Sequence, residues 1–120
     1  MTDALPPAIP AATLVIFRDT PAGPPELLMV ERAKAMAFAG GALVFPGGRV
    51  DPGDHALAAV LGSPDNETAA RIAAIRETIE EAGLPIGLSP MPSIQAFERL
   101  RAALHATARK LVWKVSATIR

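Results

Sequence analysis

The sequence predicts an α+β fold, and three observations carry this prediction. The first half contains short runs of apolar and β-branched residues, at 12–17, 26–32 and 42–45, which are typical of strands. A longer stretch that ends at Gly83 has apolar residues at the spacing of an amphipathic helix. Apolar residues then alternate over 111–119, which indicates a final strand.

The expected domain organisation is simple. Residues 1–10, with three prolines, predict an extended lead-in, and residues 11–120 predict one domain. Loops are expected over residues 19–25, which contain three prolines and a glycine, and over residues 33–41. Pro46 is expected to end the third strand.

Capping signals divide the middle of the chain into two helices. Asp54 is expected to cap a short helix over residues 55–61, which a glycine ends. Either Ser63–Pro64, with Pro64 at the first helical position, or Asp65 is then expected to start the main helix. A helical insertion and a loop are therefore expected over about residues 55–68, ahead of the main helix.

The main helix has two chemically different sides. Isoleucines are expected to be buried along one side, namely Ile72, Ile75 and Ile79. Carboxylates are expected to point outward within an arc of about 100° on the other, namely Glu77, Glu80 and Glu81. Such a cluster is either a solvated face or a site for a hard divalent cation, which prefers oxygen ligands. Gly83 is expected to end the helix in a left-handed conformation.

Two further features complete the pattern. Gly47 and Gly48 predict either a plain turn or a backbone carbonyl directed at a metal held by the acidic helix. Ser93 is expected to cap a later helix. Its expected apolar stripe consists of Ile94, Phe97, Leu100 and Leu104.

Composition excludes several classes of function. The 120 residues have no net charge, so nothing favours general affinity for nucleic acid or for an anionic membrane. There is no cysteine, hence no disulfide or thiolate chemistry. No apolar run reaches the roughly 18 residues of a membrane helix, and no signal-peptide pattern is present. A cytoplasmic location is expected, and the core should be largely aliphatic.

The motif residues resemble the signature of the Nudix hydrolase family. Gly48, the five residues 49–53 and Asp54 fit its first half, and the run from Arg76 to Leu84 fits its second half. Three departures occur: Asp54 replaces glutamate, Thr78 takes a hydrophobic position, and an insertion lengthens the spacer between the two halves. The resemblance covers about residues 11–90.

The resemblance implies both a fold and a chemistry. The fold is a mixed sheet packed between helices, an α/β/α sandwich. The chemistry is metal-dependent hydrolysis of a diphosphate linkage in a nucleoside-diphosphate derivative, with Mg²⁺ or Mn²⁺ as cofactor. The implied metal ligands are Glu77 and Glu81, then Glu80, with the Gly47 carbonyl, and the three glutamates are the candidate catalytic residues. The general base is left open. Arg76 and Asp54 are expected to form a structural ion pair.

A second resemblance concerns the substrate. Leu28, Arg32, Ala33, Gly41 and the run Phe45–Gly48 fit a segment of the branch that cleaves coenzyme A, from which Val30 and Ala37 depart. Coenzyme A or acyl-coenzyme A is the substrate that this resemblance favours, with Arg32, Phe45 and Gly48 as substrate-binding residues. For Arg32, a solvated surface position is an equal alternative.

The C-terminal part leaves a second hypothesis open. Only residues 85–120 follow the signature, whereas the family continues with more strands and a helix. The sheet could therefore be incomplete, and the chain could be a non-catalytic Nudix-like binding module. An open sheet edge would favour a homodimer. The expected partner is otherwise a small nucleotide-type molecule.

Overall fold

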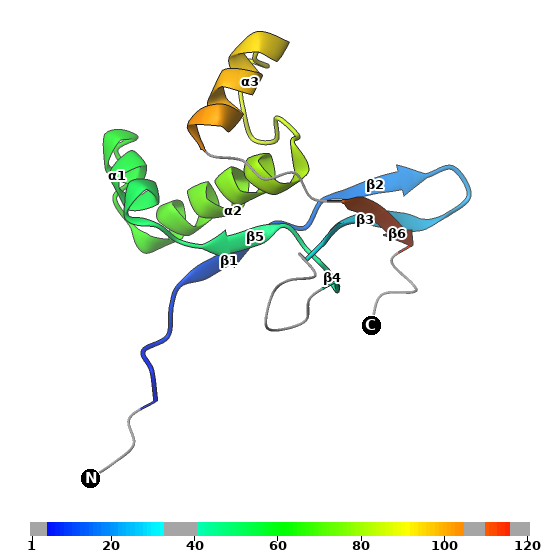
Figure 1. Cartoon of the computed structure of the whole chain (residues 1–120), viewed down its shortest axis with the longest axis horizontal. Helices are drawn as coiled ribbons and strands as arrows, with labels where there is room; N and C mark the ends of the chain where they lie inside the picture. Colours follow the sequence, from blue (N-terminus) through cyan, green and yellow to red (C-terminus); the bar gives the residue numbers. More distant parts are fainter. Residues whose placement is uncertain (1–4, 33–40, 105–109, 116–120) are drawn as a thin grey trace.

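The structure, a computed structural model, describes residues 5–32, 41–104 and 110–115. It confirms the predicted α+β class (Figure 1). The first five elements are strands and the next three are helices, followed by one strand. In chain order these are β1 (Ala11–Thr13), β2 (Phe17–Thr20), β3 (Gly23–Glu31), β4 (Leu43–Val44), β5 (Gly47–Arg49), α1 (Pro52–Val60), α2 (Asn66–Ala82), α3 (Ile94–Ala103) and β6 (Leu111–Val115).

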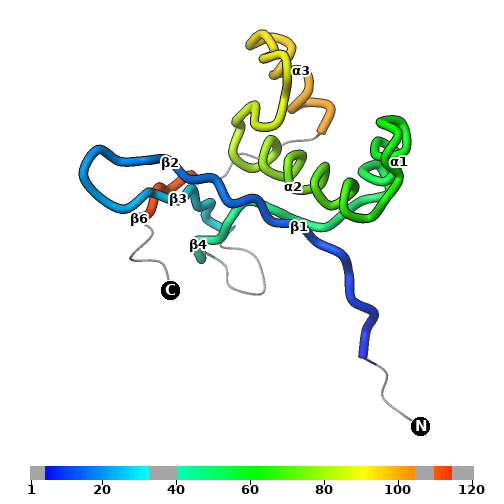
Figure 2. Tube along the Cα trace, turned by 180° about the vertical axis from the view of Figure 1, so that it is seen from behind, coloured from blue at the N-terminus to red at the C-terminus, as the bar shows by residue number. Residues whose placement is uncertain are grey.

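The strands form two sheets. β1 pairs with β5, while β3 pairs with β2, β4 and β6. Every strand pair among the described residues is antiparallel, so the expected mixed sheet is here two antiparallel sheets. The three helices lie on the same side of these strands, as both views show (Figures 1 and 2).

The single strand expected over residues 12–17 is instead divided between the two sheets. The Leu14 amide donates to the Pro46 carbonyl at 2.9 Å, on the side of β5. The Ile16 carbonyl accepts from the Leu28 amide at 2.9 Å, in β3. The segment between β1 and β2 therefore links the sheets. Exposed and half-buried residues alternate along it.

The loop expected over residues 19–25 is much shorter in the structure. β2 continues to Thr20 and β3 begins at Gly23, so only Pro21 and Ala22 form the turn. The prolines are accommodated because the register shifts between Arg18 and Thr20, at the outer end of the hairpin.

The core combines β3 with the small residues of two helices. Leu28 and Val30 of β3 have no exposed surface. Alanines bring α1 and α2 close together, because a methyl side chain lets helix axes approach. Apart from the acidic Asp54 and Glu81, the fully or almost fully buried helical residues are Ala58, Ala69, Ala73, Ala74, Thr78 and Ile79.

The expected apolar stripes are only partly buried. In α2, Ile79 is buried, whereas Ile72 and Ile75 are half-buried, because alanines occupy the central contact positions. In α3, no residue is fully buried and Ile94 is 81% exposed. Instead, Arg101 fixes α3 by donating to the Ile79 and Glu80 carbonyls at 3.2 and 3.1 Å, as a cation at the C-terminal end of α2.

The helix boundaries confirm some capping signals and correct one. The Asp65 side chain accepts from the Thr68 amide at 2.7 Å, and Gly83 ends α2 with φ of 67°. The short helix begins earlier than expected, at Pro52, with Asp51 as its N-cap. Asp54 lies three residues into the capping motif and accepts from the Asp51 amide at 2.8 Å.

The later elements follow the sequence pattern closely. The Ser93 hydroxyl accepts from the Ala96 amide at 3.1 Å, as expected of a cap. β6 pairs along β3 from Leu111 to Val115, and residues 116–119 of the expected strand lie outside the described part of the chain. No helix among the described residues is both long and apolar enough to cross a bilayer.

Candidate active site

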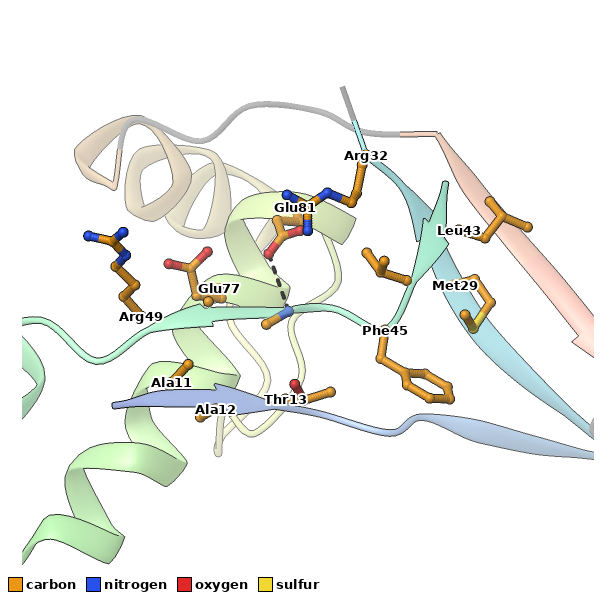
Figure 3. Close-up of a pocket in the computed structure, with 13 residues that line it drawn as sticks. Ala11, Ala12, Thr13, Met29, Arg32, Leu43, Phe45, Arg49, Glu77 and Glu81 are labelled. Carbon is orange, nitrogen blue, oxygen red and sulfur yellow. Dashed lines mark hydrogen bonds between the residues drawn. The ribbon is translucent and has the colours of Figure 1, made fainter. Parts of the chain in front are cut away.

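The two glycines of β5 lie directly against the acidic side of α2 (Figure 3). The Gly47 amide donates to Glu81 Oε1 at 3.3 Å. A Cβ atom added to Gly48 would lie 2.5 Å from Glu77 Cδ, closer than any side chain tolerates. Gly48 thus lies this close to the helix because it lacks a side chain, whereas a Cβ added to Gly47 would meet the Ala12 carbonyl oxygen of β1.

The edge of β5 that faces α2 presents backbone groups to the glutamates. On the opposite edge, the Val50 amide donates to the Pro10 carbonyl beside β1. The Gly47 amide and the Arg49 carbonyl instead bond to side chains of α2. Since the N–H and C=O of one strand residue leave on the same edge, the Gly47 carbonyl also lies on the side of α2.

Arg76 organises the helix side of the site. Its Nε and Nη2 donate to the two carboxylate oxygens of Asp54 at 2.9 and 3.0 Å. Its Nη1 donates to Glu77 Oε1 and to Glu80 Oε1, both at 3.0 Å. Arg76 therefore contacts these two glutamates as well as the expected partner Asp54, because its fork of donors reaches both sides at once.

The carboxylates are more buried than an outward-facing cluster would be. Glu81 is only 7% exposed, and the side chains of Glu77 and Glu80 are about one-fifth exposed. The reason is that β5 covers this side of α2. The solvated-face alternative is therefore wrong for Glu81.

Burial and the contacts with Arg76 shift the pKa values of the neighbouring carboxyl groups in opposite directions. Burial raises the pKa of Glu80, helped by the Glu77 charge and opposed by Arg76. For Asp54, burial also raises the pKa, but hydrogen bonds from Arg76 and from the Asp51 amide outweigh it, so the pKa is lowered. The same bond to Asp54 holds the pKa of Arg76 above its ordinary value. Asp54 and Arg76 are thus a fixed ion pair.

The described residues do not assemble three or more acidic, histidine or cysteine side chains in a geometry that could hold a metal ion. The hydrogen bonds explain this arrangement. Glu77 and Glu80 converge on one Arg76 nitrogen, while Glu81 turns to the Gly47 amide. The donor set is nevertheless all oxygen, which suits Mg²⁺ or Mn²⁺. Because Gly48 has no side chain, the space beside the Glu77 carboxylate also stays open.

A cavity of about 840 Å³ lies over these groups. Gly47, Glu77 and Glu81 line it, as do all three residues expected to bind substrate, Arg32, Phe45 and Gly48. Glu80, Asp54 and Arg76 are not among its lining residues. The cavity has the size of a small-molecule site.

Arg32 has one unusual feature in this cavity. Its Nε is buried without a hydrogen-bond partner among the described residues. Leaving a buried donor unpaired costs about 1–3 kcal/mol, so such groups are rare outside functional sites. The residue as a whole is half-buried, so the burial concerns the Nε atom and not the entire side chain.

Sequence reasoning missed Arg49, which lines the cavity on the side of Glu77 (Figure 3). Its position directly after the glycine pair was the available signal. Thr13 and Met29 also line the cavity and carried no signal, because only strand pairing brings β1 and β3 to this place.

Thr78, the departure from the hydrophobic position of the signature, is fully buried. Its hydroxyl donates to the Ala74 carbonyl one turn earlier, at 2.7 Å. The hydroxyl is therefore satisfied within the helix, and a threonine can replace an apolar residue there.

We expect Gly48→Ala to reduce turnover at least about tenfold, because the added methyl must displace the Glu77 carboxylate. Gly53→Ala is the matched control, since a Cβ there meets nothing within 4 Å. Steady-state rates of both variants test this. Equal rates would show that the close approach of Gly48 to Glu77 does not matter.

Comparison with known proteins agrees with this geometry. The family described as NUDIX domain matches residues 8–110. A crystal structure of a NUDIX hydrolase from Alicyclobacillus acidocaldarius is similar, with 39% sequence identity and a TM-score of 0.56. The similarity covers 65% of this chain and 38% of that one, so the matched part spans well under half of the length of that protein. No curated protein matches the chain. With the family match spanning most of its length and the glycine pair set against the acidic helix, the chain belongs to the Nudix domain family.

Proposed function

We propose that this protein is a metal-dependent hydrolase that cleaves a diphosphate linkage in a nucleoside-diphosphate derivative. The observation that supports it most is the convergence of Glu77, Glu81 and the glycine pair on one cavity. These groups come from elements far apart in the sequence. If the glutamates served only as a solvated surface, they would not be buried beneath β5, the strand that contains the glycine pair.

In this proposal Glu77 and Glu81 hold the metal, with the Gly47 carbonyl and Glu80 completing the set. The bound Mg²⁺ or Mn²⁺ would neutralise charge on phosphoryl oxygens and lower the pKa of a bound water. Metal entry requires Glu77 and Glu80 to leave Arg76 Nη1, whereas the bonds of Arg76 to Asp54 can persist. Arg76 and Asp54 thus hold the loop before α1 against α2.

The substrate class we favour is coenzyme A or acyl-coenzyme A. The motif around Arg32 and Phe45 supports it, and both residues line the cavity. Of the two departures from that motif, Val30 is buried core in β3, and Ala37 lies outside the described residues, as does the matching Ala33.

A second candidate is a non-catalytic Nudix-like binding module. It is favoured by one observation: α3 has no fully buried residue, so the described part of the chain gives it little to pack against. In that case a homodimer that joins sheet edges could supply the missing cover, and sedimentation would detect it.

A substrate panel distinguishes the two candidates. We expect release of a nucleoside monophosphate or a phosphorylated remainder from at least one of coenzyme A, ADP-ribose, NADH, dinucleoside polyphosphates or 8-oxo nucleotides, with Mg²⁺ or Mn²⁺ present. Turnover of coenzyme A above the others would support the substrate assignment. No turnover of any member would favour the binding module.

Metal binding is tested separately from turnover. A ligand that binds only the folded state raises the melting temperature. We therefore expect Mn²⁺ at millimolar concentration to raise it by several degrees, about 1–2 kcal/mol of stabilisation at roughly ten times the dissociation constant. Glu77→Gln should abolish the shift. A flat response of the unmodified protein would contradict the metal site.

A further inference from the structure

Arg49 is a charged residue whose backbone is held in place by the fold, while its side chain takes part in no interaction with the described residues. Its backbone is fixed, because it pairs with Ala11 of β1 and its carbonyl accepts from Arg76 Nη2 at 3.0 Å. Its guanidinium has no hydrogen bond or ion pair with any described residue. The side chain is exposed and lines the cavity. A cation that is held on a rigid strand and forms no ion pair with the described residues is available for an anionic ligand.

The cavity carries a second arginine at its other side. Figure 3 shows Arg49 beside Glu77 and Arg32 beside Glu81, so the two carboxylates lie between two guanidinium groups. These four side chains are the formally charged groups among the residues that line the cavity. The order along the cavity is therefore cation, two anions, cation.

The charges indicate what such a cavity would bind. In the proposed function, on which this step rests, a divalent cation offsets Glu77 and Glu81. The two arginines then remain as net positive charge at separate places. An ionised diphosphate diester carries two negative charges on adjacent phosphoryl groups. Guanidinium groups bind phosphoryl oxygens with paired donors, which gives orientation as well as attraction.

We propose that Arg49 binds one phosphoryl group of the substrate, on the Glu77 side, while Arg32 faces the other side. Arg49 would thereby fix the direction in which a diphosphate lies across the carboxylates. Its role is binding and orientation, since it does not contact the carboxylates in the described structure.

Binding of imidodiphosphate with Mg²⁺, measured by calorimetry, tests this without requiring turnover. We expect Arg49→Gln to weaken binding about tenfold, as the loss of one charge-assisted contact implies. Arg49→Lys should recover part of the loss, because the charge returns without the paired donors. Arg99→Gln is the matched control, an exposed arginine on α3 that does not line the cavity.

The possible results separate this inference from the proposed function. Equal binding by Arg49→Gln and the unmodified protein would overturn the role of Arg49. An equal loss of binding in Arg99→Gln would also overturn it, because it would indicate a general charge effect. Absence of binding by the unmodified protein would overturn it as well. Binding that depends on Arg49 in a chain that hydrolyses nothing would support the inference and remove the hydrolase proposal. In an active chain, we expect KM to rise about tenfold with kcat little changed.

Discussion

Glu81→Gln is expected to lower kcat by more than about a hundredfold while the protein stays folded. Loss of a group that only orients a metal ligand typically costs 10–100-fold, so loss of the ligand itself should cost more. Glutamine keeps the length of the side chain and an oxygen that can accept from the Gly47 amide, now at 3.3 Å. The fold should therefore survive, which circular dichroism and the melting temperature would show.

Glu67→Gln is the matched control for that variant. Glu67 is on the same helix, but its side chain is 76% exposed, and within the described part of the chain it pairs only with the exposed Arg71, at 2.8 Å. Its kcat should equal that of the unmodified protein. If Glu81→Gln kept its turnover and Glu67→Gln were also active, Glu81 would have no part in the reaction.

Asp54→Asn is expected to cause the largest loss of stability. Asp54 is 2% exposed and accepts two bonds from Arg76, whose side chain is 17% exposed. The change removes the carboxylate that receives two of the Arg76 donors, whereas Glu77 and Glu80 stay beside Arg76 Nη1. We therefore expect a cost at the lower end of that for a broken buried pair, about 3 kcal/mol. For a domain of this size the melting temperature should fall by about 10 °C. Urea unfolding would measure the change in free energy.

Arg71→Gln is the control, because it breaks an ion pair of the same type on the same helix, but in solvent. Exposed pairs contribute at most about 1 kcal/mol, so its stability should change little. Similar losses in the two variants would show that burial does not strengthen the Asp54–Arg76 pair.

The same pair predicts a dependence on pH. The pKa of Asp54 is lowered below its ordinary value of 3.8, because hydrogen bonds from Arg76 and Asp51 outweigh burial. The stabilisation by this group is therefore complete above 3.8 and is lost as the pH falls through the lowered pKa. Acid unfolding of Asp54→Asn should lack this component. If the stability of Asp54→Asn fell with acid pH in the same way as that of the unmodified protein, this role of Asp54 would be contradicted.

The sequence determined the local elements and the chemistry of the residues involved. The C-terminal end of α2 could be predicted, because the left-handed Gly83 acts within one turn of the chain. At its start the sequence left Ser63–Pro64 and Asp65 as alternatives, and the structure has Asp65 as the cap. The α+β class and the family followed from the same local patterns and from the motif. The capping of α1 was predicted three residues too late, because Asp51 and Asp54 both have the side chain of a cap.

Only the tertiary structure decided how the site is assembled. Strand pairing and the packing of β5 on α2 bury Glu81 and place Arg49 in the cavity, and neither depends on neighbours in sequence. Likewise, the reach of Arg76 to four carboxylates, those of Asp51, Asp54, Glu77 and Glu80, depends on where the loop before α1 lies. Helix ends form from interactions across a few residues, whereas burial and charge pairing depend on which distant segments meet.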